Sequence, residues 1–260
     1  MTTAKMAAAS LLTSWDRIAY LVWQDFVSPY RRTAFSAFWA VVRPILPISA
    51  FIFLRMILPS GDEGVHPVVY VGIGTILWFY LSELLMSPVQ TFRRKRSLLG
   101  TTQFTPIGII ATGAGGVLLD FALRATFALP FVLSYGSIEL ENVPAGLALI
   151  VTSGIVSLGI GIILLPAFLV FPDLYEAATV ILRYAIFFSL AVFPLGPETS
   201  DLLMNTNPFA LIIAETRACL LGNGVPFTLI VTLCALSIGT TYLGFWVTGA
   251  LGSVLREAAS

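Results

Sequence analysis

Charged residues are scarce in this chain of 260 residues. They make up 11% of it, against about 25% in an average soluble domain, while 57% of its residues are hydrophobic. So much apolar surface cannot be covered by so few charges in a water-soluble globule, and the composition predicts an integral membrane protein. The 14 basic and 14 acidic residues cancel, which gives no reason to expect nucleic acid as a partner.

Lysine, histidine and cysteine are also nearly missing. Lys5 and Lys95 are the only lysines and neither follows glycine, so the Gly-x-x-x-x-Gly-Lys loop that holds ATP phosphates is absent. The single histidine, His66, excludes metal motifs that need two histidines, and we expect it to cap an exposed loop. Cys219 and Cys234 form no Cys-x-x-Cys pair and are interpreted as small packing residues. We expect no catalytic residue, no metal and no cofactor in this chain.

Apolar runs are what the chain has in abundance. A helix needs about 20 mostly apolar residues to cross a bilayer, and six stretches qualify: 36–58, 67–91, 105–134, 145–171, 178–195 and 226–250. The third is longer than one crossing requires and contains Gly113, Gly115 and Gly116, so we expect it to tilt, kink or begin along the surface. The sequence predicts an all-α polytopic protein with a single transmembrane domain over residues 1–260.

Residues 196–225 are too apolar for a free loop and too interrupted by proline and glycine for a clean crossing. They predict a re-entrant hairpin before the last span. Non-helical backbone at membrane depth is tolerated where it is buried in protein or lines a wet cavity. This hairpin therefore indicates a pathway or a subunit interface nearby.

Residues 11–32 predict an amphipathic helix that lies in the membrane interface. Apolar side chains recur there at steps of three and four, and two tryptophans accompany them: Leu11, Trp15, Ile18, Val22, Trp23 and Phe26. Arg31 and Arg32 follow directly, as is typical of a helix at the lipid headgroups. An ordinary packed helix is the alternative interpretation.

Basic residues collect on one side of the predicted spans. Nine lie on the side of the two termini, against Arg217 alone in the opposite loops: Lys5, Arg17, Arg31, Arg32, Arg93, Arg94, Lys95, Arg96 and Arg256. This asymmetry predicts that both termini are cytoplasmic. The run from Arg93 to Arg96 anchors the topology, and we also consider that it grips anionic headgroups or an acidic surface of a partner protein.

Arginines inside the predicted spans are costly, by roughly 2.5–3.5 kcal/mol at a helix centre. Asp120 and Arg124 are spaced i, i+4 and are predicted to neutralise one another, while Arg55 near a span end is close enough to extend toward water. The alternative is that Arg55, Arg124 and Arg217 line a passage. Arginine keeps its charge there and offsets the desolvation of an acidic polymer.

Aromatic residues form two clusters within the predicted spans. Trp78, Phe79 and Tyr80 lie in the second span, and Tyr184, Phe187 and Phe188 lie in the fifth. Aromatic faces stack on sugar rings with few fixed hydrogen bonds, which suits a sliding polymer. Interface belts and helix packing are the alternative roles.

Four stretches in order resemble the polysaccharide-export permeases of the type 2 ABC transporter superfamily. The first is YRRTAFSAFWAVVRPILP at 30–47, with Arg32, Trp39 and Pro44 in the family's spacing, and the second is the span 67–91 with its basic turn and Phe-x-Pro-Ile at 104–107. The third is FPDLYEAATVILRYAIFFSLAVFPL at 171–195. It is closer to capsule exporters than to O-antigen exporters, because Pro172 stands where O-antigen exporters usually have an arginine. The fourth is Asn207-Pro208 with Arg217 ten positions after the asparagine, where Glu215 lies one position later than the family's glutamate.

The resemblance implies a permease subunit in the bacterial inner membrane. It implies a homodimer bound to two copies of a nucleotide-binding ATPase subunit, which would hold ATP and Mg²⁺, with a channel for a lipid-linked polysaccharide between the two permeases. The amphipathic helix and the first cytoplasmic loop would touch the ATPase subunit through Asp16, Arg17, Asp25, Arg93, Arg94, Lys95 and Arg96. Capsule systems would add periplasmic and outer-membrane export proteins.

Two other functions remain open at this point. The first alternative is a permease of the same superfamily for another cargo, such as O-antigen, teichoic acid, a lipid or a drug. The second is a membrane enzyme that acts on lipid headgroups. Short outer loops and the hairpin at 196–225 favour a polymer exporter over the first of these. Copurification of a P-loop ATPase separates both exporters from the enzyme.

Overall fold

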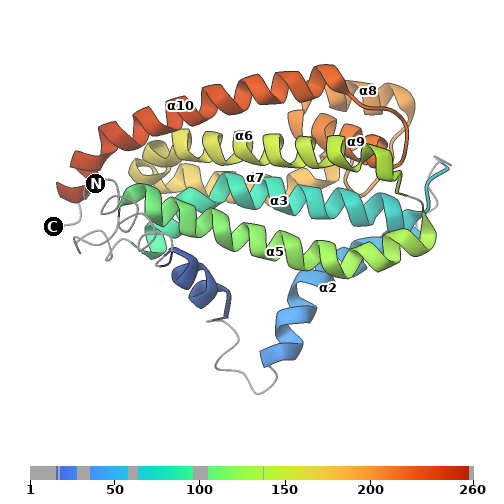
Figure 1. Ribbon diagram of the computed structural model, residues 1–260, viewed down its shortest axis with the longest axis horizontal. Helices are drawn as coiled ribbons and strands as arrows, with labels where there is room; N and C mark the ends of the chain where they lie inside the picture. Colours follow the sequence, from blue (N-terminus) through green and yellow to red (C-terminus); the bar gives the residue numbers. More distant parts are fainter. Residues whose placement is uncertain are drawn as a thin grey trace, which may run out of the picture.

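The computed structural model describes residues 16, 18–27, 36–57, 64–95, 105–136 and 138–257, with only the backbone at 36–37, 39–41, 43–44 and 250–257. Every element in this part of the chain is a helix (Figure 1). Four of the described helices are long and apolar enough to cross a membrane: α3 (Pro67–Arg94), α5 (Pro106–Tyr135), α6 (Val143–Val170) with the 3-10 turn η1 (Leu140–Asn142) before it, and α10 (Phe227–Glu257). The all-α class is confirmed, and the helices have the length and composition of a membrane protein.

Proline sets where several helices begin. It occupies the first turn of α3, α5 and α6 and of the shorter helices α7 (Pro172–Ala185), α8 (Pro197–Thr206) and α9 (Pro208–Leu220). The first turn has no use for the missing N–H, and the fixed φ angle of proline suits a helix start. His66 caps α3, because its Nδ1 accepts a hydrogen bond from the Val68 N–H at 3.3 Å. His66 was expected to cap an exposed loop; it caps the start of a helix instead and is partly buried, with its ring stacked on that of Tyr135.

Helix α3 lies at the centre of the fold. It packs along α5 and α6, while α10 packs along the other side of α6 (Figure 1). In the most apolar window of α3, 83% of the residues are buried, against 6% for α5 and 11% for α10. Helix α3 is thus enclosed by protein, and the other two present most of their apolar surface outward.

The helices run between two ends of the bundle. At one end, on the left of Figure 1, α3 and α6 finish and α5 and α7 begin. Helices α8 and α9 lie at the opposite end, where α10 begins. Arg93, Arg94 and Lys95 belong to the first end, whereas Arg217 belongs to the second.

Helix bounds agree with the predicted stretches within a few residues for α2 (Ser36–Ile57), α3, α5 and α6, and α10 begins as predicted but runs on to Glu257. The prediction of a single helix over 178–195 is wrong, because this stretch is not one helix. Helix α7 starts earlier and stops at Ala185, and the 3-10 turn η2 (Ile186–Phe188) follows. Leu190 then has a φ of 56°, a left-handed conformation that an α-helix cannot include. The chain reaches α8 through an irregular, largely buried segment.

The stretch 105–134, expected to tilt, kink or begin along the surface, is one continuous helix whose glycines allow close packing. A Cβ at Gly113 would collide with Thr91 on α3, and a Cβ at Gly115 would lie 2.7 Å from Val22 Cγ2. Helix Ile18–Val27 therefore packs on α5 with Ile18 and Val22 half-buried. Trp23 lies on its exposed side, apart from Ile18 and Val22.

Residues 196–225 fold as α8 and α9, joined at Asn207. The Asn207 side chain caps α9 by accepting from the Phe209 N–H at 3.0 Å, and its Nδ2 donates to the Phe188 carbonyl at 3.0 Å. Gly222 and Gly224 have φ angles of 91° and 103°, which other residues rarely adopt, and they turn the chain into α10. The predicted hairpin is therefore a pair of short helices.

Candidate functional site

The charged side chains inside the helix bundle form a cross-helix pair. Arg124 Nη2 on α5 lies 2.7 Å from Glu83 Oε1 on α3, and the two side chains are 11% and 33% exposed. The Arg124 guanidinium also sits over the Phe79 ring, 5.0 Å from its centroid. The spacing within α5 predicted Asp120 as the group that neutralises Arg124; the structure shows a carboxylate of the neighbouring helix at the guanidinium, because α3 packs closely on α5.

Glu83 is the residue that sequence reasoning missed. It stands in the apolar run of α3, where an acid is costly unless a cation neutralises it. The cost of an acid in this apolar run could have predicted that Glu83 has a basic partner on another helix. Asp120 on the same face of α5 lies near enough to Glu83 to act on it electrostatically.

A cavity of about 300 Å³ lies beside this pair, between α2, α3 and α5. Its walls are almost entirely apolar and include Ile48, Phe53 and Phe131, and Arg124 is the charged residue that reaches it. The Nε and Nη1 atoms of Arg124 are themselves buried from solvent. These two donors have no hydrogen-bond partner among the described residues, so the cavity is bordered by a guanidinium that is only partly satisfied.

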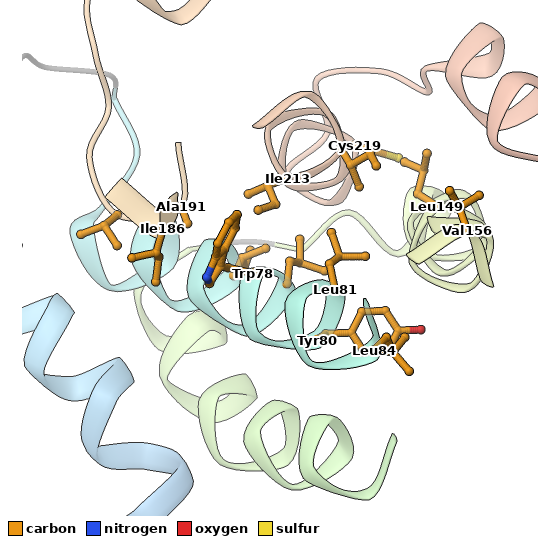
Figure 2. Close-up of a cluster of buried hydrophobic side chains, with 14 of the residues drawn as sticks. Trp78, Tyr80, Leu81, Leu84, Leu149, Val156, Ile186, Ala191, Ile213 and Cys219 are labelled. Carbon is orange, nitrogen blue, oxygen red and sulfur yellow. The ribbon is translucent and has the colours of Figure 1, made fainter. Parts of the chain in front are cut away.

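The aromatic residues of α3 pack inside the chain. Trp78 is 3% exposed and meets the Phe209 ring edge-on, with centroids 5.5 Å apart. Figure 2 shows its indole pointing between Ile213 of α9 and the segment around Ile186 and Ala191. Its place in the core corrects the interpretation of Trp78 as a pathway residue, because a passage between two copies cannot reach it without opening the bundle.

Tyr80 belongs to the same core cluster and is also buried. Its ring contacts Phe121 at 4.5 Å, and its hydroxyl lies against Gly154 of α6, where a Cβ would collide with it. Phe79 faces the other way and covers Arg124. The three consecutive aromatics therefore make three different packing contacts. The interpretation of Tyr80 as a pathway residue is likewise corrected, because it lies in the core.

The aromatics at the end of α7 and in η2 lie on the surface. Tyr184 is 59% exposed and Phe188 is 64% exposed, while Phe187 is partly covered by Phe51 of α2 and by Phe193, with ring centroids 6.0 and 6.3 Å away. These side chains face outward from the junction of α2, α7 and η2. Of the six predicted pathway aromatics, these three are placed where a second chain or a cargo can touch them.

Arg217 holds the α9 hairpin to the rest of the fold. Its Nη1 donates to the Tyr70 carbonyl at 3.2 Å, its Nη2 donates to the Leu190 carbonyl at 3.0 Å, and it stacks on the Tyr70 ring at 3.5 Å. The side chain borders an outer cavity of about 320 Å³ with Asn223. It fixes the irregular segment after η2, including the left-handed Leu190. Arg55, the third predicted pathway arginine, is buried at the end of α2 rather than extended toward water.

The predicted ATPase contacts meet at the opposite end of the bundle. Lys95 Nζ lies 2.8 Å from Asp25 Oδ2, which joins the end of α3 to helix Ile18–Val27. Arg93 Nη2 donates to the Phe168 carbonyl at 3.1 Å, whereas Arg94 is exposed and bonds to its own helix. Asp16 is exposed. Arg17 and Arg96 lie outside the described residues.

The two cysteines differ in environment. Cys219 is buried in the core, as predicted, but Cys234 is exposed on α10, which corrects its interpretation as a packing residue.

No family model matches the chain, and no curated protein has significant similarity to it. The geometry therefore offers two surfaces for function: the exposed aromatics of α7 and η2, and the charged end of α3 with helix Ile18–Val27.

Proposed function

We propose that this chain is the membrane permease of an ATP-driven exporter of a lipid-linked polysaccharide. Its dependence on a separate ATPase subunit is the most direct test of this proposal. The observation that carries the proposal is the order of elements. A surface helix comes first, and the four long helices α2, α3, α5 and α6 follow, with the basic turn after α3. A short α7, a helical hairpin and a final long helix complete the order that the four resembling stretches imply.

In this proposal the chain crosses the bacterial inner membrane six times. Helices α2, α3, α5, α6 and α10 provide five crossings, and the stretch from α7 through η2 and the irregular segment before α8 provides the sixth. Helices α8 and α9 form the re-entrant hairpin on the outer side. Both termini lie in the cytoplasm. The charged end of α3 then faces the cytoplasm, where Arg93, Arg94 and Lys95 obey the positive-inside rule.

The permease acts as a homodimer with two ATPase subunits. The exposed aromatics Tyr184, Phe187 and Phe188 are the residues that we place beside the cargo, since they are free to stack on sugar rings. Arg124 and Arg217 serve the fold, because each is already bonded within the chain. The cargo's acidity, as in a capsular polymer, thus rests on the resemblance and not on these arginines.

Copurification tests the proposal. An affinity-tagged chain is purified in mild detergent from its own host, and its partners are identified by mass spectrometry. We expect a P-loop ATPase subunit, with ATP hydrolysis by the complex and none by the isolated chain, because the phosphate-binding loop is absent. Nucleotide turnover by the isolated chain, or a preparation that lacks any such subunit and modifies lipid headgroups, would refute it.

Cargo is tested in cells by surface polymer. Tyr184→Ala and Phe188→Ala are expected to lower the polymer at the cell surface while ATPase activity persists, because the loss is one of stacking and not of assembly. Phe227→Ala, which removes an equally exposed ring at the start of α10, is the matched control. Normal polymer in the first two variants would contradict this placement, and an unchanged polymer in a deletion strain would point to another cargo.

A further inference from the structure

The last turn of α3 is bonded to two different parts of the fold. Arg93 reaches the corner between α6 and α7, and Lys95 reaches helix Ile18–Val27. Residues two apart on an α-helix point about 200° away from each other, given 3.6 residues per turn. A single turn of helix therefore connects two elements on its opposite sides.

Arg93 completes the end of α6. The Phe168 carbonyl that it binds would pair, in a continuing helix, with the N–H of the residue four positions later, which is Pro172 and has none. Helix α6 also carries no basic residue in its own last turn. Arg93 supplies both the missing donor and a positive charge at the negative end of the helix dipole.

Arg93 also binds the first turns of α7. Its guanidinium carbon lies 4.1 Å from the centroid of the Tyr175 ring, and this ring meets Phe168 edge-on with centroids 6.3 Å apart. A planar guanidinium can stack on a ring and donate from its edge at the same time, which an ammonium cannot. One side chain thus links α3, α6 and α7.

Lys95 makes the corresponding link on the other side. Its ion pair with Asp25 at 2.8 Å is formed by a lysine side chain that is only 10% exposed. Val22 of the same helix packs into the space left by Gly115 on α5. Helix Ile18–Val27 is therefore tied to the end of α3 by a charge and to α5 by packing.

We infer that the last turn of α3 is a coupling junction, and that Arg93 is the positioning residue that makes the start of α7 move with it. This inference rests on the proposed function, in which the ATPase subunit touches helix Ile18–Val27 and the basic turn after α3. Nucleotide-driven movement of those elements passes through Lys95 to α3 and through Arg93 to α7. Helix α7 leads directly to the exposed aromatics Tyr184 and Phe188.

A thiol reporter on α7 tests the junction. Glu176→Cys places an exposed thiol next to Tyr175, in a chain whose exposed Cys234 is replaced by serine. The complex with its ATPase subunit is reconstituted in lipid nanodiscs, and the rate of maleimide reaction is measured with and without ATP and vanadate. We expect nucleotide to change this rate in the parent complex and Arg93→Gln to abolish the change, with ATP hydrolysis continuing and export lost.

Two further variants separate coupling from folding. Arg93→Lys keeps a donor and a charge for the Phe168 carbonyl at the end of α6 but cannot stack on Tyr175 at the same time, so the fold should be kept and the nucleotide response lost as in Arg93→Gln. Asp173→Asn removes an exposed charge from the first turn of α7 and should leave the response unchanged. If Arg93→Gln fails to accumulate, Tyr175→Leu removes the stacking face instead and is expected to abolish the response.

The outcomes distinguish the inference from the function on which it rests. A nucleotide response in Arg93→Gln equal to that in Asp173→Asn overturns the junction. A parent complex that hydrolyses ATP without any change in the reporter overturns it as well, since the start of α7 then stays still. Failure of any ATPase subunit to bind the parent chain overturns the proposed function itself.

Discussion

Removing Glu83 is the sharpest perturbation that the structure offers. In Glu83→Gln, Arg124 keeps its charge but loses the carboxylate 2.7 Å away, and only 11% of its side chain is exposed. Breaking a buried ion pair by removing one partner costs about 3–5 kcal/mol. Since Glu83 is a third exposed and water can partly replace it, we expect a value near the low end, about 3 kcal/mol.

Removing the other partner should cost less. Arg124→Gln leaves behind a carboxylate that is 33% exposed and therefore more easily hydrated or protonated. The variant also loses the contact with the Phe79 ring at 5.0 Å, and the sum is about 2 kcal/mol. The double variant should cost less than the two single costs together, because no charge of the pair is left uncompensated.

Unfolding in mixed micelles, titrated with dodecyl sulfate and followed by tryptophan fluorescence, measures these free energies. Glu198→Gln on the surface of α8 is the matched control and should change stability by less than about 0.5 kcal/mol. The reasoning is refuted if Glu83→Gln is no more costly than this control. It is also refuted if Arg124→Gln is the more costly of the two.

Three other perturbations follow from the packing and the charges. Gly161→Ala should cost about 1–3 kcal/mol in the same titration, since its Cβ would collide with a backbone carbonyl of α3, whereas Gly116→Ala, with open space around it, should be neutral or slightly stabilising. Arg217→Gln should release the α9 hairpin, which is measured as faster alkylation of the buried Cys219; an unchanged rate would show that its two carbonyl bonds are dispensable. Thr3→Cys should stay protected from a membrane-impermeant thiol reagent in intact cells and react after permeabilisation, because the basic asymmetry places the N-terminus in the cytoplasm; labelling of intact cells would contradict that topology.

Where a helix begins was readable from the chain. Proline at the first turn of α3, α5 and α6, and the caps His66 and Asn207, act over one or two residues. The start of α7 at Pro172 was missed, because the predicted span began at 178. The end of the fifth predicted span was not readable. Arg217, 27 positions after Leu190, holds that segment in its irregular course, and apolar composition alone gave no sign of it.

The charged pair shows the same division. Spacing along one helix suggested Asp120 for Arg124 and gave no sign of Glu83, which lies 41 positions away and becomes a neighbour only when α3 packs on α5. The pathway aromatics divide in the same manner. Trp78 and Tyr80 are in the core and Tyr184 and Phe188 are outside, although all four stand in apolar stretches of similar appearance.

The sequence by itself determined that the chain is helical, that its helices suit a membrane, and where most of them begin. Only the tertiary structure decided which helix is enclosed. Helices α3 and α5 have the same mean hydropathy of 1.7, yet 83% of the window in α3 is buried and 6% of that in α5. Hydropathy measures the free energy of leaving water, and lipid tails are as apolar as a protein interior. An apolar side chain therefore satisfies that requirement equally well against lipid or against another helix, and the choice between them is made by shape and by the few polar contacts that join the helices.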